Sequence, residues 1–373
     1  MKVLQATKAF SPHRGGIETV VEQLHLGLPR RAIESAVLCA APPKTTSQHV
    51  HVSRSRQMGT VRSIPLAPMY PIDLCRSRAD VLLIHIPSAL PEITTAVAWK
   101  HLARRFDRVF LWWHSDIIRQ RVLKAVYEPA VRRLLKSADG VFVATPHHVS
   151  SSALLSESNV PKHVVPYGLN LPDYAELAAD FSILQGLRRD RPFLLFIGRL
   201  VYYKGVPELL EMARRLPECD LVVVGEGPLS PLVDDLEHET GGRVRRLSGL
   251  KRAELVGLMH ACSFVVFPSV AESEAFGIVQ TEAMACGKPV VAFDLPTGVS
   301  WVNRHGATGL LAERGNLSQF CDYVKQLLND ESLRDELGAN AKVWAHEEFD
   351  EETMLDRVAE VFTPTTTRLD RTV

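Results

Sequence analysis

The stretch SFVVFPSVAESEAFGIVQTEAMACGKPVVAF, residues 263–293, holds in one run the unit from which the fold is built. Two short apolar segments, FVVF and PVVAF, flank a segment of helical period that ends at Gly287. Strands that are apolar throughout and are joined by a helix are typical of parallel sheets covered by helices on both faces. The stretch therefore predicts a strand, a short helix and a second strand of a parallel α/β domain.

Similar apolar segments recur along the whole chain. The first half contains KVLQA, SAVLCA, DVLLIH, RVFLWWH, GVFVAT and HVVPYG, and the second adds PFLLFIG, DLVVVGEG, RVRRLSG and GLLAER. A chain of 373 residues has room for about two domains. We expect two doubly wound α/β domains over residues 1–170 and 171–345, with a linker near 169–192. The end of the chain reads as helices over 317–362 and a disordered tail over 363–373.

Composition narrows the class of protein. With 46% hydrophobic and 23% charged residues, the chain is typical of a globular protein, and no stretch approaches the about 18 consecutive apolar residues of a membrane-spanning helix. The first residues show no signal-peptide pattern, so we expect a cytoplasmic location. The six cysteines are scattered without CxxC spacing, which predicts reduced thiols, most of them in the core.

The net charge of zero hides an asymmetry between the two halves. Residues 1–180 hold 22 Lys and Arg against 14 Asp and Glu, and the remainder holds 21 against 29. A basic first half suits nucleic acid, an anionic lipid surface or a phosphorylated acceptor, and charge alone does not choose among them.

Two acids in the opening stretch lie around a predicted helix start. A carboxylate there can simply compensate the helix dipole, worth about 0.3–1 kcal/mol, which explains Glu274 better than the deeper Glu282. Alternatively, Glu274 accepts hydrogen bonds from sugar hydroxyls and Glu282 from the vicinal diol of a ribose. The free N–H groups at Phe276, Gly277 and Ile278 would then face a phosphate.

The segment GRLVYYKG places two cations directly after an apolar strand. Arg199 can bind two oxygens at once and Lys204 is a mobile point charge, a pair that suits a diphosphate. Ordinary solvated surface charges are the alternative. Because Gly198 and Gly205 bracket the segment, we favour the phosphate site.

Four further positions carry weaker signals. Gly16 opens a helix whose N-terminus can approach a phosphate, Gly225 lies in a glycine turn after a strand, and His114 lies at a strand exit. Backbone groups near Leu250 could read the nucleotide base. Each position is also compatible with a purely structural role.

In combination these motifs resemble the retaining glycosyltransferases of family 4. The E-x7-E pair, GR-x4-KG, GGIE and the His114 loop occur in the order seen in that family. WWHSDIIRQ and SEAFGIVQ further resemble the bacterial mannosyl- and rhamnosyltransferase branch, which builds O-antigen or other surface polysaccharide from GDP-sugars. The resemblance implies the GT-B fold, two Rossmann-like domains facing a cleft, with a final helix at about 346–362 that returns to the first domain.

The resemblance also implies roles for individual residues. Arg199 and Lys204 would neutralise the donor diphosphate, Glu274 would bind the transferred hexose, and Glu282 would hold the ribose. Gly16 would approach the distal phosphate, and His114 would line the sugar and acceptor side.

Without an Asp-x-Asp at a strand end, we expect a metal-independent enzyme with no cofactor besides the nucleotide-sugar substrate, and no nucleic-acid partner. The expected acceptor is a polyprenyl-diphosphate-linked or other glycan. The basic segment over 117–138 suits contact with the anionic inner membrane, and a solvated helix face explains it equally well.

Four other readings remain open. A UDP-sugar-dependent family 4 enzyme shares the main motifs, and a nucleotide-sugar epimerase would use the same fold. An NAD dehydrogenase is disfavoured because Pro228 breaks the glycine fingerprint. A silent nucleotide-sugar-binding subunit would retain affinity and lack turnover.

Overall fold

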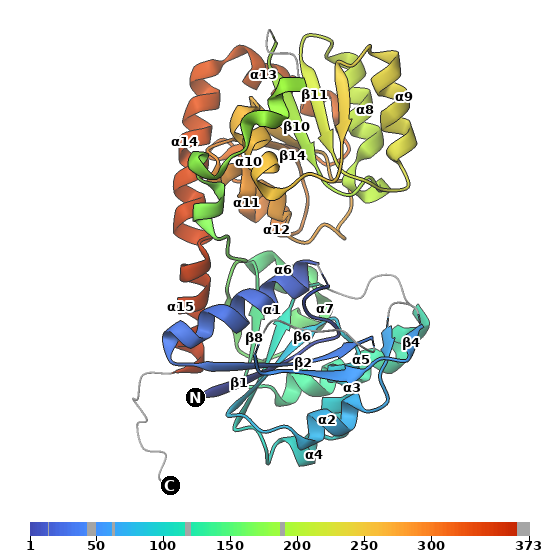
Figure 1. The fold of residues 1–373 in the computed structure, drawn as a ribbon, viewed down its shortest axis with the longest axis vertical. Coiled ribbons are helices and arrows are strands. Elements are labelled where there is room, and N and C mark those ends of the chain that lie inside the picture. Colours follow the sequence, from blue (N-terminus) through green and yellow to red (C-terminus); the bar gives the residue numbers. More distant parts are fainter. Residues whose placement is uncertain (14, 43–49, 62–63, 116–120, 187–190, 364–373) are drawn as a thin grey trace. The chain divides into compact units, whose positions relative to one another are not determined.

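The computed structural model describes residues 1–13, 15–42, 50–61, 64–115, 121–186 and 191–363. The chain divides into two compact units. The first comprises Met1–Gly168 and Glu351–Val373, and the second comprises Leu169–Asp350. Each unit is a parallel sheet with its own helices (Figure 1).

The first unit is built on a seven-stranded sheet in the order β3-β2-β1-β6-β7-β8-β9. All neighbouring pairs in this sheet are parallel. Its strands are β1 Lys2–Ala6, β2 Glu34–Ala41, β3 Val52–Arg56, β6 Val81–Ile86, β7 Arg108–Trp113, β8 Gly140–Val143 and β9 Lys162–Val164. A small antiparallel pair, β4 Gly59–Val61 and β5 Ile64–Leu66, stands apart from it.

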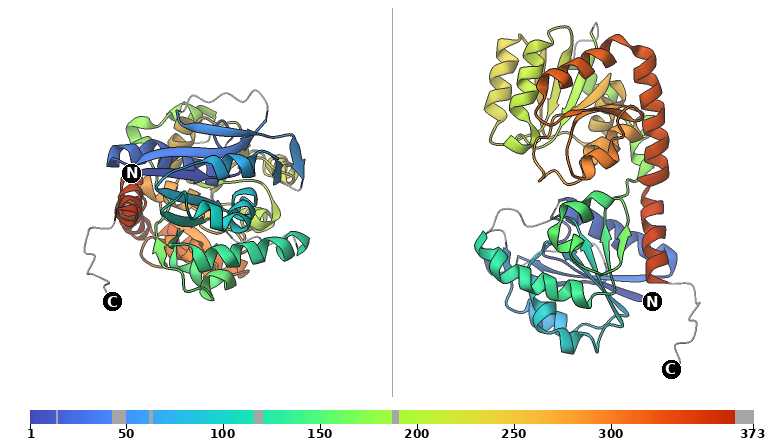
Figure 2. Two further views of the ribbon diagram at one scale, coloured as in Figure 1. Left: turned by 90° about the horizontal axis from the view of Figure 1, so that it is seen from below. Right: turned by 180° about the vertical axis from the view of Figure 1, so that it is seen from behind.

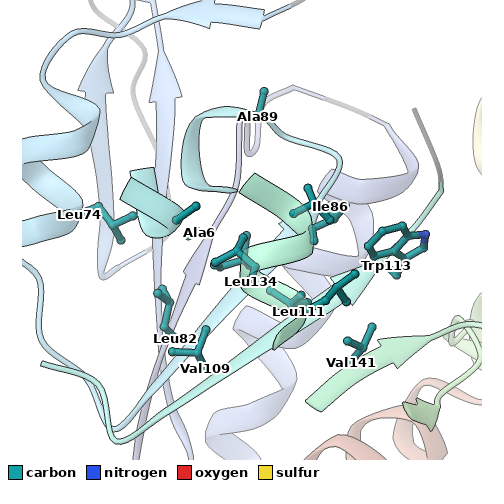
Figure 3. Close-up of a cluster of buried hydrophobic side chains, with 14 of the residues drawn as sticks. Ala6, Leu74, Leu82, Ile86, Ala89, Val109, Leu111, Trp113, Leu134 and Val141 are labelled. Atoms are coloured by element: carbon teal, nitrogen blue, oxygen red, sulfur yellow. The ribbon is translucent and has the colours of Figure 1, made fainter. Parts of the chain in front are cut away.

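The helices of the first unit lie on both faces of the sheet (Figure 1). They are α1 Gly16–Gly27, α2 Tyr70–Arg76, α3 Leu90–Val97, α4 Trp99–Leu102, α5 Arg121–Ser137, α6 Pro146–Ser151, α7 Ala153–Ser156 and α15 Glu351–Phe362. Successive side chains of one strand point to opposite faces of the sheet. Leu111 of β7 belongs to the cluster that includes Leu134 of α5 (Figure 3). Its neighbour Phe110 packs on Phe362 of α15, with ring centroids 5.3 Å apart.

The second unit repeats the architecture with a six-stranded parallel sheet in the order β12-β11-β10-β13-β14-β15. Its strands are β10 Phe193–Ile197, β11 Asp220–Val224, β12 Val244–Leu247, β13 Phe264–Phe267, β14 Val290–Asp294 and β15 Gly309–Glu313. Its helices are α8 Val206–Arg215, α9 Ser230–Glu239, α10 Arg252–Ala261, α11 Ile278–Ala285, α12 Gly298–Val302, α13 Leu317–Asn329 and α14 Glu331–Glu348. Figure 2 shows helices on both faces of this sheet as well. The prediction of two doubly wound parallel α/β units is therefore confirmed.

The opening stretch of sequence folds as predicted. It forms β13, α11 and β14, and the helix is followed by Gly287 at a φ of +72°. All six cysteines are free thiols, and five of them are buried, Cys75 being half-buried.

Two features of the structure differ from the sequence reading. The strand β3, VSRSR, was not predicted because an edge strand lacks the continuous apolar run of a central one. The expected linker near 169–192 is largely part of the second unit, where it forms the short 3-10 helices Leu171–Tyr174, Glu176–Ala178 and Phe181–Gly186. Tyr174 in this segment is only 3% exposed. The tail expected from 363 lies outside the described residues from 364 onward.

Candidate active site

The loops that follow β10 and β11 are held together backbone to backbone. Leu200 N–H donates to Glu226 O at 2.9 Å, and Gly198 N–H donates to Val224 O at 3.0 Å. A Cβ on Gly225 would lie 1.9 Å from Gly198 O, so no larger residue fits without moving the main chain. The predicted positions Gly198 and Gly225 are therefore neighbours at the carboxyl edge of the sheet, where ligands bind in open parallel sheets.

A second backbone approach joins the β10 loop to the loop after β13. Val270 N–H donates to Tyr203 O at 3.0 Å. Gly205 adopts a φ of +69°, and a Cβ there would lie 1.8 Å from Pro268 O. Glycine is therefore required at position 205 by both its dihedral angle and the available space.

This approach brings Lys204 and Glu274 into direct contact. Lys204 Nζ lies 2.6 Å from Glu274 Oε2, and the two side chains are 13% and 10% exposed. Ser269 Oγ donates to the same carboxylate oxygen at 3.3 Å. Lys204 Nζ also lies 5.1 Å from the ring centroid of Phe267, within cation–π range. The pair thus places one cation and one hydrogen-bond acceptor side by side in a partly desolvated position.

Arg199 has a different environment from Lys204. Its side chain is exposed, and its guanidinium forms no hydrogen bond or ion pair with any residue in the described part of the chain, although its carbonyl oxygen accepts from Val201 N–H. An exposed guanidinium at a strand exit can turn toward an anion without first giving up a partner.

The start of α11 lies directly after the Glu274 loop. Gly277 caps the helix at a φ of +76°, no side chain caps it, and its first turn contains no acid. Gln280 N–H donates to Gly277 O at 2.8 Å, whereas the N–H groups at the first two positions, Ile278 and Val279, have no intrahelical acceptor. The helix dipole adds positive potential there. Phe276 is buried, with its ring packed edge-on against Phe349 at 5.9 Å.

Glu282 lies further along α11 and already has a hydrogen-bond donor. The Tyr174 hydroxyl donates to Glu282 Oε1 at 2.6 Å. Burial raises the pKa of Glu282, whereas the hydrogen bond from Tyr174 and the charge of Arg252 lower it. Burial also raises the pKa of Tyr174, so the phenol is the donor in this bond.

Leu250 lies just before Lys251, the N-cap of α10, and is partly buried. It follows Gly249, whose φ is +67°. This loop extends from the carboxyl end of β12, at the same edge of the sheet as Gly198 and Gly225.

In the first unit, Gly16 is the first residue of α1. Among the described residues, a Cβ at this position would meet no atom within 4 Å. The described part of the fold therefore leaves space for a larger residue at position 16.

His114 is buried in a directional chain of polar groups. Its Nε2 lies 3.0 Å from His85 Nδ1, and His85 Nε2 lies 3.0 Å from Gln5 Oε1. Gln5 uses its amide N–H groups on Val21 O and Ser35 Oγ, so its oxygen is the acceptor.

The tautomers of the two histidines follow from this chain. His85 must carry its proton on Nε2 and His114 on Nε2, and the Tyr167 hydroxyl then donates to His114 Nδ1 over 3.0 Å. Burial lowers the pKa of His85 to about 3 and that of His114 well below its usual value. Both ring nitrogens of His114 are thus engaged, and the ring is neutral.

Tyr174, Arg252 and Tyr167 are among the residues of these sites that were not predicted from the sequence. Tyr174 was overlooked because it lies in the segment read as a linker, and Tyr167 because it follows the last strand of the first unit. An aromatic residue in a polar connecting segment was the available signal for Tyr174.

The described residues contain neither a cluster of metal ligands nor a membrane-spanning helix. No group of three or more His, Cys, Asp and Glu in these residues is arranged to hold a metal ion. Within the same residues, no helix has the length and apolar character needed to cross a bilayer.

Comparison with known proteins identifies relatives along the whole chain. The model "Glycosyl transferases group 1" matches residues 182–344, and "Glycosyltransferase Family 4" matches residues 14–172. The O-antigen chain mannosyltransferase C of Escherichia coli is 29% identical over 97% of this chain and 98% of its own. The D-rhamnosyltransferase WbpZ of Pseudomonas aeruginosa is 30% identical over 92% and 90%. The structure of HepE from Anabaena in complex with UDP has a TM-score of 0.78 at 21% identity, covering 97% of this chain and 99% of that one.

Proposed function

Because the chain belongs to the family 4 glycosyltransferases, we propose that it transfers mannose or rhamnose from a GDP-sugar to a lipid-linked glycan in O-antigen or other surface polysaccharide synthesis. Similarity over nearly the full length to an O-antigen mannosyltransferase and a D-rhamnosyltransferase supports the choice of sugar and pathway. The choice of GDP as the nucleotide of the donor rests on the sequence motifs alone.

The observation that carries the proposed chemistry is the contact between Lys204 and Glu274 at 2.6 Å. Breaking the bond between the anomeric carbon and the diphosphate oxygen develops negative charge on the leaving group. Lys204, the exposed Arg199 and the start of α11 would stabilise that charge, which is commonly the largest catalytic term. Glu274, adjacent to Lys204, would accept hydrogen bonds from the hexose hydroxyls, and Glu282 would accept them from the ribose.

We further propose that the reaction is metal-independent and retains the anomeric configuration. Two cations and a helix N-terminus supply the positive charge that a divalent ion would otherwise provide. The acceptor would attack from the face that the leaving group occupied, and the diphosphate would take the acceptor's proton.

For His114 we propose a supporting role beside the acceptor rather than proton transfer. Both of its ring nitrogens are occupied, by His85 and Tyr167. Depressed basicity also makes the ring a poor proton acceptor near neutral pH.

The proposed acceptor is a polyprenyl-diphosphate-linked glycan, and we propose peripheral contact with an anionic membrane. The basic segment over 117–138 is described only in part, because residues 116–120 lie outside the described residues. On the described part of α5, Arg133 and Lys136 are exposed, whereas Arg132 is paired with Glu128 and Glu157. Flotation with anionic vesicles at low and high salt tests this: salt-sensitive binding supports it, and no binding overturns it.

A transfer assay tests the main proposal. GDP-mannose, GDP-rhamnose and UDP-glucose are each incubated with a synthetic polyprenyl-diphosphate glycan, with and without EDTA. We expect an α-linked product from a GDP-sugar, at a rate that EDTA does not change. Transfer from UDP-glucose alone would establish the UDP-sugar alternative, for which the UDP complex of HepE is the supporting observation. Conversion of the donor without acceptor would indicate an epimerase.

A further inference from the structure

The carboxylate of Glu282 is held by a residue from outside its own helix. Tyr174 ends the 3-10 helix Leu171–Tyr174, a few residues after the chain enters the second unit at Leu169. Its hydroxyl donates to Glu282 Oε1 at 2.6 Å. A hydrogen bond to an ionised group is short and strong, and it selects one orientation of the carboxylate.

Tyr174 is in turn fixed on several sides. Arg252, the first residue of α10, lies with its guanidinium carbon 4.6 Å from the Tyr174 ring centroid and donates to the phenol oxygen. Asp173 lies 3.5 Å from the same guanidinium. His260 Nε2 lies 2.9 Å from Tyr174 O, which anchors the main chain to α10. The phenol therefore has little freedom to leave Glu282.

The charge state of Glu282 depends on the same contacts. Burial raises the pKa of this carboxyl group, and Tyr174 and Arg252 oppose that rise. Cys286, the C-cap residue of α11, is close enough for the charge of Glu282 to affect its thiol, and burial raises the pKa of this thiol to about 12. Cys286 is therefore neutral at physiological pH, and the phenol and the guanidinium are the groups that favour the ionised carboxylate.

Enough acceptor capacity remains on the carboxylate for a ligand. An ionised carboxylate offers about four lone-pair positions, and Tyr174 uses one of those on Oε1. Both hydroxyls of a vicinal diol can still donate to the others.

We propose that Tyr174 and Arg252 are positioning residues for nucleotide recognition, which hold the Glu282 carboxylate in the orientation that receives the ribose diol. This inference rests on the proposed function, in which Glu282 binds the ribose. Neither residue needs to touch the nucleotide, because both act through the carboxylate.

Calorimetry with GDP and 2′,3′-dideoxy-GDP tests the proposal, with UDP and its dideoxy analogue measured in parallel. The ratio of the two dissociation constants isolates the contribution of the diol. We expect wild-type protein to favour the natural nucleotide, Glu282→Gln to lose that preference, and Tyr174→Phe to reduce it about tenfold. Arg252→Met should reduce it less, and Arg252→Lys should restore part of the loss.

The matched control is Tyr323→Phe on α13, which removes the same oxygen from a phenol bonded to Gln319 of its own helix. It should leave the ratio unchanged. Thermal unfolding verifies that Tyr174→Phe remains folded.

The pH dependence of the diol preference gives a second test. As the solution is acidified, Tyr174→Phe should lose the preference at a higher pH than wild type does, because its Glu282 carboxyl group has lost a donor that favours ionisation. A residue that only stabilised the fold would not shift this pH profile.

Two results have different meanings. A full diol preference in Tyr174→Phe, together with its loss in Glu282→Gln, would overturn the positioning role and leave the proposed function intact. A full preference in Glu282→Gln would instead remove Glu282 from the ribose site, and would overturn both the positioning role and the part of the proposed function that assigns Glu282 to the ribose.

Discussion

Lys204 and Glu274 form an ion pair of 2.6 Å between two loops that follow different strands, β10 and β13. Backbone contacts on either side of the pair hold the two loops together. Val270 N–H bonds Tyr203 O, and Gly205 passes against Pro268 O where no side chain fits. The pair is thus part of the loop structure and part of the proposed donor site, and the two contributions can be separated.

Lys204→Met should abolish most transfer and also destabilise the second unit. Removing one partner leaves Glu274 partly buried without a counter-charge, at a cost of roughly 3 kcal/mol. The double variant Lys204→Met with Glu274→Gln should regain most of the stability and none of the activity. Urea unfolding and the transfer assay measure the two effects, and exposed Lys325→Met on α13 is the control. Recovered transfer in the double variant would show that the charges are dispensable.

Arg199→Ala should lower kcat/KM about 10²-fold without changing stability. The side chain is exposed, and surface substitutions of this kind change the free energy of unfolding by less than about 0.5 kcal/mol. The rate should nevertheless fall, because the variant has lost a charge that stabilises the leaving group. Arg199→Lys should recover only part of the rate because an ammonium group cannot bind two oxygens in a planar fork. Unchanged turnover in Arg199→Ala would place this residue outside the site.

Gly16→Ala and Gly205→Ala form a matched pair of glycine substitutions. Gly205→Ala should lower both the melting temperature and activity, because its Cβ would lie 1.8 Å from Pro268 O at a φ of +69°. Gly16→Ala should leave the melting temperature unchanged, since its Cβ meets no atom of the described residues within 4 Å. If a donor phosphate approaches this backbone, the substitution should nevertheless raise the KM for donor. A normal donor KM would argue against that approach.

The neutral histidines of the first unit should make its stability fall with acid. The pKa of His85 in the folded protein, about 3, lies below the ordinary value of 6.5, and that of His114 is also lowered. At a pH between the folded and the ordinary pKa, these two histidines are protonated in the unfolded chain and not in the folded chain. Stability is therefore fully present above pH 6.5 and falls as the pH decreases, by about 1.4 kcal/mol per pH unit for each fully unprotonated ring. Urea unfolding at pH 7 and pH 5 measures the loss.

NMR of the imidazole nitrogens provides an independent check of the same histidines. We expect both rings to remain neutral at pH 5 with the proton on Nε2. An imidazolium signal from His114 at that pH would contradict the hydrogen-bond chain.

Periodicity and residue type identified most of the fold and several site positions. Apolar runs such as FLLFI and FVVF predict buried parallel strands because their side chains must be covered on both faces. The edge strand β3 was not found, since VSRSR faces solvent along one side and carries no such run. The helix start at Gly277 was predicted because a turn residue separates the apolar strand from a helical pattern.

Local sequence did not reveal the partners of the predicted side chains. Glu282 was predicted as a ribose ligand, but Tyr174 as its donor was not, because the two meet only when the connecting segment packs on α10 and α11. His114 was predicted to line a site, yet its imidazole is already bonded to His85 and Tyr167. Both contacts join residues that are distant in the chain.

The sequence by itself determined the two parallel α/β units, the strand exits that carry Arg199, Lys204 and Glu274, and the family to which the chain belongs. These depend on local patterns: hydrophobic period, turn residues and short motifs. Only the tertiary structure decided that Lys204 contacts Glu274 and that Glu282 is held by Tyr174. It also decided that a side chain would clash with the described residues at position 205 and not at position 16. Such facts depend on how separate loops close against one another, which no stretch of neighbouring residues encodes.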